Sequence, residues 1–107
     1  MYKEKFSDRL SQLRLKKGVS ARDMSLSIGQ NPGYINNIET GKSLPSMMGF
    51  FYICDYLNVT PMEFFNFDSS HPKELDSIYS DLNKLTDSQF KNIKEIVEDL
   101  ARRTAYR

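Results

Sequence analysis

Two adjacent asparagines, Asn36 and Asn37, are the residues whose types and spacing point most clearly to chemistry. An amide side chain both donates and accepts hydrogen bonds, so it can read a polar partner without carrying a charge. Ile35 and Ile38 flank the pair at helical spacing and form an apolar edge, which leaves Tyr34 and the asparagines pointing elsewhere. The pattern favours a short helix whose outer face reads something polar.

The asparagines fall in the second of two short helices that a tight turn separates. The first helix is expected over about residues 21–28, with Ser20 as its N-cap. The second is expected over about residues 32–40, with Asn31 as its N-cap and Pro32 at its first helical position, where a missing N–H costs nothing. A helix of this length is not stable alone, so neighbouring elements must hold it in place.

Three further helices complete a domain around this pair. Apolar residues at helical spacing predict helices over about residues 3–17 and 47–57. A capping box followed by a proline predicts a short helix over about residues 60–65. Together these five segments predict a compact all-α domain over residues 1–66.

The rest of the chain reads as a linker, residues 67–72, and a helical hairpin, residues 73–107. Two apolar stripes define the hairpin, one made of Leu75, Ile78, Leu82 and Leu85 and the other of Phe90, Ile93, Val97 and Leu100. A capping box at Thr86 and Gln89 separates the two stripes. Because two helices alone bury too little surface, the apolar faces must pack on the first domain or on a second chain.

Composition limits the classes of function. The chain has 107 residues, of which 39% are hydrophobic, so it can build one core. Its net charge of +1 neither supports nor excludes a nucleic-acid partner. No apolar run approaches the roughly 20 residues of a membrane span and the N-terminus does not resemble a signal peptide, so we expect no membrane partner and a cytoplasmic location.

Residue types that carry catalysis or bind metals are scarce. The single cysteine, Cys54, lies in an apolar stretch and suits a small core side chain. The single histidine, His71, lies beside a proline in the linker and has no metal-ligand spacing around it. We therefore expect no catalytic residue, no metal ion and no cofactor.

Residues 9–65 resemble the phage-repressor (Xre/Cro/C1-type) helix-turn-helix family. The segments that carry the resemblance occur in the family's order: RLSQLRLKKGVS, then Gly29 after the first short helix, then YINNIETGKSLPS, then LNVTPMEFF. The resemblance implies a five-helix, lambda-repressor-like DNA-binding domain, in which the second and third helices form the DNA-binding motif. It further implies a sequence-specific transcriptional regulator, a repressor, that inserts the helix at about residues 32–40 into the major groove.

By this resemblance, Pro32, Gly33, Asn36 and Asn37 occupy the positions that face the groove. Asparagine can form a bidentate hydrogen bond to adenine, so Asn36 and Asn37 are the expected base readers. Pro32 and Gly33 can offer only apolar or backbone contacts. The alternative interpretation is that both asparagines are merely solvated helix surface.

Contacts to the DNA backbone should supply most of the affinity and fix the register. The expected backbone contacts are Ser20, Arg22, Asn31, Tyr34, Thr40, Lys42 and Ser46. The resemblance also implies a partly buried ion pair between Arg14 and Glu39, and each of these charges predicts the other because a buried charge without a partner is costly.

The hairpin leaves two interpretations open. It can join two copies into a homodimer that sets two reading helices about one DNA turn apart, or it can fold back within one chain. A second class of function is a protein-interaction module, antitoxin-like or partner-binding, that keeps the helix-turn-helix core, binds a protein partner through the hairpin and binds DNA weakly.

Overall fold

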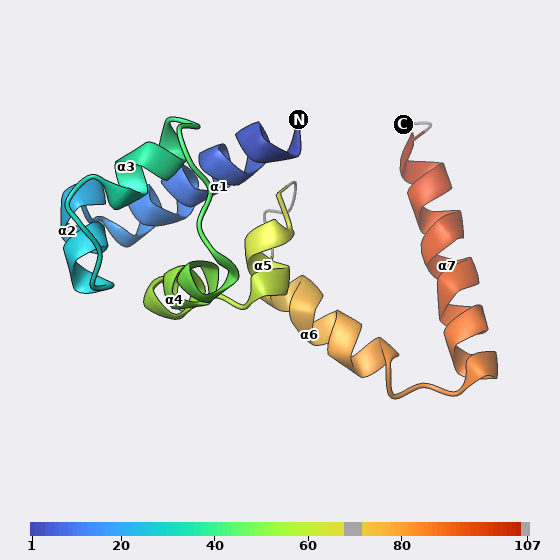
Figure 1. Ribbon diagram of the computed structural model, residues 1–107. Helices are drawn as coiled ribbons and strands as arrows, with labels where there is room; N and C mark the ends of the chain where they lie inside the picture. The colour runs from blue at the N-terminus through green and yellow to red at the C-terminus, as the bar shows by residue number, and fades with distance from the viewer. Residues whose placement is uncertain (68–71, 106–107) are drawn as a thin grey trace. The chain divides into compact units, whose positions relative to one another are not determined.

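A computed structural model describes residues 1–67 and 72–105 of the chain. Within these ranges the chain forms α-helices and no strands, which confirms the predicted all-α fold (Figure 1). The chain divides into two compact units, unit 1 (Met1–Ser70) and unit 2 (His71–Arg107). His71 and most of the predicted linker 67–72 lie outside the described residues.

The helices of unit 1 are α1 (Tyr2–Lys17), α2 (Ala21–Ser27), α3 (Tyr34–Glu39), α4 (Met47–Leu57) and α5 (Pro61–Phe65). The helices of unit 2 are α6 (Pro72–Leu82) and α7 (Asp87–Ala105). The bounds of α1, α2, α4 and α5 agree with the predicted ranges to within one residue. Local signals explain this agreement, since a hydroxyl caps the start of α2, α4 and α5 and Gly18 ends α1 in the left-handed conformation, with φ 81°.

The start of α3 differs from the prediction. We expected Asn31 to be the N-cap and Pro32 the first helical residue, whereas α3 begins at Tyr34 and its N-cap is Gly33. The side chain of Asn31 instead accepts a hydrogen bond from the Gly33 N–H, 3.1 Å away, which makes a turn of the backbone rather than a helix. Pro32 therefore lies in the turn between α2 and α3, and α3 is shorter than the expected 32–40.

One hydrophobic core holds unit 1 together, and α3 packs on α1 and α2. The largest fully buried side chains come from every helix of the unit: Leu10, Met24, Ile35, Ile38, Ile53 and Phe64. Phenylalanine rings extend this core, with 5.1 Å between the ring centroids of Phe50 and Phe64 in an edge-to-face arrangement. Figure 1 shows α3 lying beside α1 and α2, in agreement with its contacts to both.

Unit 2 has no comparable core, because none of its described side chains is buried. The predicted capping box at the start of α7 is confirmed: the Gln89 N–H donates to Thr86 Oγ1 at 3.2 Å, and the Thr86 N–H donates to Gln89 Oε1 at 3.0 Å. Leu85 was wrongly assigned to the first stripe, because α6 ends at Leu82 and Leu85 lies in the connection. The remaining stripe residues lie on α6 and α7, as predicted.

Candidate nucleic-acid interface

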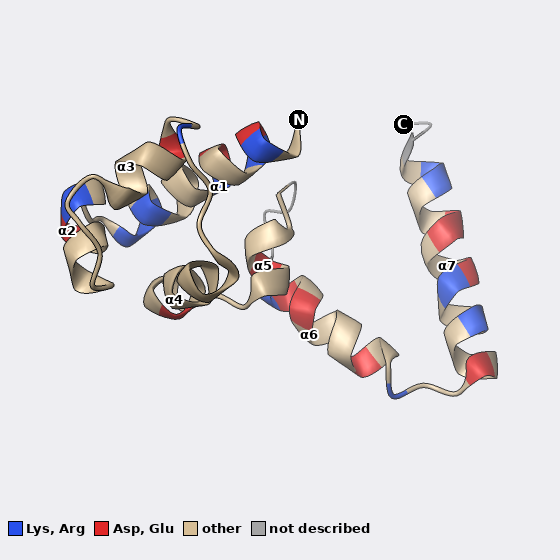
Figure 2. Cartoon of the chain, viewed as in Figure 1, with Lys and Arg blue, Asp and Glu red and all other residues tan. Residues whose placement is uncertain are grey.

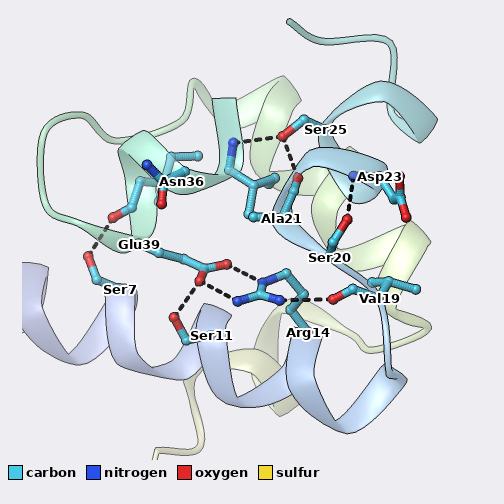
Figure 3. A network of polar contacts seen from close by, with 12 residues as sticks. Ser7, Ser11, Arg14, Val19, Ser20, Ala21, Asp23, Ser25, Asn36 and Glu39 are labelled. Atoms are coloured by element: carbon cyan, nitrogen blue, oxygen red, sulfur yellow. Dashed lines mark hydrogen bonds and ion pairs between the residues drawn. The ribbon is translucent and has the colours of Figure 1, made fainter. Parts of the chain in front are cut away.

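A serine of α2 fixes the start of α3. The Ser25 hydroxyl donates to the Ala21 carbonyl at 2.7 Å and accepts a hydrogen bond from the Ile35 N–H at 2.9 Å (Figure 3). The first N–H groups of a helix have no partner inside the helix, and Gly33 has no side chain with which to cap them. Ser25 therefore replaces the missing cap from a neighbouring helix and fixes where α3 begins.

The far end of α3 is held by α1 through a charged network (Figure 3). Arg14 donates from Nε to Glu39 Oε2 at 2.7 Å and from Nη2 to Glu39 Oε1 at 2.9 Å, and its Nη1 donates to the Val19 carbonyl at 2.8 Å. Ser11 donates a further hydrogen bond to Glu39 at 2.7 Å, and the Ser7 hydroxyl donates to the last-turn carbonyl of Ile38 at 2.8 Å. The structure thus brings Arg14 and Glu39 together as a bidentate ion pair.

Burial makes this pair a structural element rather than a surface contact. Only 14% of the Arg14 side chain and 9% of the Glu39 side chain are exposed. The hydrogen bonds to Glu39 raise the pKa of Arg14 above its usual value, although desolvation acts in the opposite direction. Because a bidentate pair has a fixed geometry, it sets the axial position of the C-terminal end of α3.

Between these two anchors, α3 turns its apolar side inward and its amide side outward. Ile35 and Ile38 are fully buried, whereas Asn36 and Asn37 are exposed. The turn after α3 folds back on the same segment, because the Asn37 carbonyl accepts from the N–H groups of Lys42 and Ser43 at 2.9 and 3.2 Å. The exposed face of α3 is thus a neutral, hydrogen-bonding surface on a rigid base.

The other sequence-predicted contact residues lie at the start of α2, in the turn before α3, on α3 and in the segment that leads to α4. Exposed residues among them are Ser20, Arg22, Asn31, Pro32, Thr40, Lys42 and Ser46, whereas Gly33 and Tyr34 are partly buried. Lys42 and Arg22 bring positive charge to the loop after α3 and to α2, and the basic segments of unit 1 can be followed in Figure 2. Exposed cations near the neutral amide face of α3 suit a partner with a negatively charged backbone.

Several of these hydroxyls already have a structural task. Ser20 Oγ accepts from the Asp23 N–H and Ser46 Oγ accepts from the Gly49 N–H, both at 3.0 Å, so each can still donate its proton outward. Thr40 Oγ1 donates to the Asn36 carbonyl at 2.8 Å. The Thr40 hydroxyl must therefore turn before it can donate to a phosphate.

Sequence reasoning missed Arg9, which is only 6% exposed. Its Nε donates to the Phe64 carbonyl at 2.8 Å and its Nη2 to the Glu63 carbonyl at 2.7 Å, so it closes the C-terminal end of α5. Desolvation lowers the pKa of Arg9, and the Glu63 charge opposes that effect. A usable signal was present, because Arg9 lies between Phe6 and Leu10 on the apolar side of α1.

Other kinds of site find no support in the described residues. Within residues 1–67 and 72–105, no cluster of His, Cys, Asp or Glu side chains is placed to hold a metal ion. Over the same ranges, no helix combines the length and the apolar character that crossing a bilayer requires. Cys54 is buried, and burial raises its pKa to about 11, so its thiol is not an activated nucleophile.

Comparison with protein-family models gives one match, to a model described as helix-turn-helix. It spans residues 10–64, which is slightly more than half of the 107-residue chain, and it contains α2, the turn and α3. Comparison with curated proteins and with solved structures gave no significant match.

Proposed function

Because the chain belongs to the helix-turn-helix family, which is a family of DNA-binding regulators, we propose that it is a sequence-specific transcriptional repressor. Unit 1 binds DNA by inserting α3 into the major groove, which is wide enough to admit one α-helix. The observation that carries the proposal is the exposed Asn36–Asn37 face on a helix anchored at both ends. Binding to a promoter in the cytoplasm then blocks transcription.

Asn36 and Asn37 are the base readers in this proposal, because an asparagine amide matches the donor and acceptor that adenine presents in the major groove. Pro32 and Gly33 precede α3 in the turn, so they approach the groove with apolar and backbone atoms only. Specificity therefore rests on the two amides, and we expect an operator half-site that contains adenine.

Phosphate contacts supply the remaining affinity. The proposed set consists of Ser20, Arg22, Asn31, Thr40, Lys42 and Ser46, whereas the Tyr34 hydroxyl lies against the backbone of α4 at Gly49. Residues 1–67 carry 8 Lys and Arg against 6 Asp and Glu, a net charge of +2. Because so small a charge implies few phosphate contacts per copy, one copy alone should bind weakly and a second copy should strengthen binding.

Unit 2 supplies a surface for that second copy. Eight large apolar side chains of α6 and α7 are between 41% and 59% exposed: Leu75, Ile78, Tyr79, Phe90, Ile93, Ile96, Val97 and Leu100. An interface of standard size buries roughly 800 Å² on each partner, and these half-exposed apolar side chains offer surface for such an interface. A homodimer through unit 2 would place two α3 helices on two half-sites of one operator.

DNA binding is tested by titrating labelled DNA from upstream of the gene, and a scrambled duplex, at several salt concentrations. We expect the wild type to prefer the upstream DNA, and Asn37→Ala to lose roughly 1 to 3 kcal/mol of that preference. Lys42→Ala should weaken binding to both duplexes and reduce the salt slope by about one. Lys84→Ala, in the connection before α7, is the control. Equal binding of the wild type to both duplexes would refute a specific operator there.

Dimerisation is tested separately by sedimentation of the full chain across concentration. Val97→Asp should convert the dimer to a monomer, because it places a charge within the apolar surface of α7, whereas Glu95→Gln on the same helix should leave the dimer intact. The monomeric variant should also lose affinity for a two-half-site operator. A wild type that stays monomeric at every concentration would contradict the homodimer.

The second candidate is a protein-interaction module that binds a protein partner through unit 2. The exposed apolar side chains of α6 and α7 favour it, because a protein partner could cover them as well as a second copy could. The two functions separate cleanly: Asn37→Ala should impair a DNA reader and leave a module that acts through unit 2 unaffected.

A further inference from the structure

The first turn of α4 contains a glycine that backbone geometry alone does not require. Gly49 is buried, and its φ lies outside the left-handed region where glycine is favoured. Glycine in a helix costs up to about 1 kcal/mol relative to alanine. A contact with another part of the molecule therefore has to explain why no side chain stands here.

That contact is the hydroxyl group of Tyr34, the first residue of α3. A Cβ atom built on Gly49 would lie 2.5 Å from Tyr34 Oη, and it would lie 3.2 Å from Ser46 Oγ and 3.6 Å from Pro45 Cβ. The phenol tip thus rests directly on the bare backbone of Gly49. Even an alanine at position 49 could fit only if Tyr34 moved.

The ring of Tyr34 is not free to swing away without cost. It packs against the hydrophobic core of unit 1, and burial raises the pKa of its hydroxyl above the ordinary value. Through its contact with Gly49, Tyr34 connects the first turn of α3 to the first turn of α4, whose N-cap is Ser46. In the proposed function these two turns face the same duplex, one through bases and the other through phosphates.

We propose that Tyr34 and Gly49 are positioning residues, which set α3 against α4 so that the asparagine face and the start of α4 meet one duplex in register. This inference rests on the proposed DNA-binding function. It assigns the Tyr34 hydroxyl to the contact with Gly49. Tyr34 therefore affects the choice of DNA sequence through the position of α3.

The test uses Gly49→Ala, alone and combined with Tyr34→Phe. The added methyl group would meet Tyr34 Oη at 2.5 Å, so the phenol must shift. Because the Tyr34 ring packs against the core, we expect the first turn of α3 to move with it. We expect Gly49→Ala to weaken binding to the upstream DNA roughly tenfold, the size of a moderate overpacking penalty, while binding to the scrambled duplex stays unchanged. Met48→Ala is the matched control, because Met48 is an exposed neighbour in the same turn.

Rescue distinguishes a positioning role from a purely structural one. Tyr34→Phe removes the clashing oxygen and keeps the ring, so the double variant should recover binding to within about threefold of the wild type. If Gly49→Ala binds like the wild type, or if the double variant binds no better than Gly49→Ala, the proposal is overturned. A Tyr34→Phe variant that by itself loses affinity for both duplexes would show a direct phosphate contact and would also overturn it.

A measurement without DNA separates this proposal from the proposed function. Gly49→Ala should change the NMR amide shifts of Asn36 and Asn37, and Tyr34→Phe in the same chain should restore them. If these shifts respond but the wild type has no preferred DNA, the positioning contact stands and the repressor function fails. If the shifts of Asn36 and Asn37 do not respond, the positioning contact fails whatever the chain binds.

Discussion

Replacing Ser25 by alanine should lower the free energy of unfolding of unit 1 by about 1 to 3 kcal/mol, although the substitution removes a single heavy atom. Both Ser25 and Ile35 are fully buried. Without the hydroxyl, the buried Ile35 N–H loses its acceptor at 2.9 Å. An unsatisfied buried donor costs about this much, and the loss of a single oxygen adds little through cavity formation.

Urea and thermal unfolding followed by circular dichroism measure the effect. For a domain of this size the expected loss corresponds to a fall in melting temperature of about 5 to 15 °C. Ser27→Ala is the matched control, because it makes the same change on the exposed side of α2 and should stay within about 0.5 kcal/mol of the wild type. Hydrogen exchange adds a local readout: the Ile35 amide should lose protection.

Two results together would show that Ser25 does not fix the start of α3. One is a Ser25→Ala variant as stable as Ser27→Ala, and the other is an Ile35 amide that exchanges as slowly as in the wild type. That combination would mean that another group caps α3, so that α2 does not fix where α3 begins.

Three further predictions test the other contacts that hold unit 1 together. Arg14→Ala should lower the free energy of unfolding by about 3 to 5 kcal/mol, because it leaves the Glu39 carboxylate buried without its opposite charge. In a double-mutant cycle, the variant with both Arg14→Ala and Glu39→Ala should lose less stability than the two single variants combined. Burial raises the pKa of Cys54 from about 9 to about 11. The free energy of unfolding should therefore be constant below pH 9 and decline as the pH rises through 11, because the unfolded state loses the thiol proton first. Urea titrations at several pH values should show that Cys54→Ala lacks this decline. Arg9→Lys should lower the free energy of unfolding of unit 1, measured in urea, by roughly 1 to 3 kcal/mol. A lysine cannot donate the two hydrogen bonds that Arg9 makes to the carbonyl groups of Glu63 and Phe64 at the end of α5.

The sequence predicted the elements of unit 1 wherever the signal was local. The cap residues Ser46 and Thr60 and the terminal Gly18 each act within a few residues, so the ends of α1, α4 and α5 could be placed from spacing alone. The start of α3 was misplaced because Asn31 suits two local structures equally, an N-cap and a side-chain turn. The observed turn occurs together with the hydrogen bond from the Ile35 N–H to Ser25, which lies on another helix and is not part of the local signal.

In the candidate site too, the features set by local spacing could be predicted from the sequence, and the contacts between distant residues could not. The outward position of Asn36 and Asn37 followed from the spacing of two isoleucines, which the helical period alone determines. The seat of Tyr34 on Gly49 did not follow, because the two residues are distant in the chain and meet only after α3 and α4 have packed. Gly49 interrupts an apolar stretch of the sequence, but nothing local indicates that Tyr34 is its partner.

The arrangement of anchors around α3 implies that specificity and affinity can be lost separately. A helix of 6 residues has no stability of its own, so its position is set wholly by contacts from α1, α2 and α4. Buried isoleucines resist separation of α3 from the core but tolerate small rotations, whereas the hydrogen bonds of Ser25 and Glu39 fix its angle and axial position. In the proposed function, phosphate attraction through Lys42 is insensitive to such rotations. Weakening a polar anchor should therefore reduce discrimination between DNA sequences before it reduces binding to DNA in general.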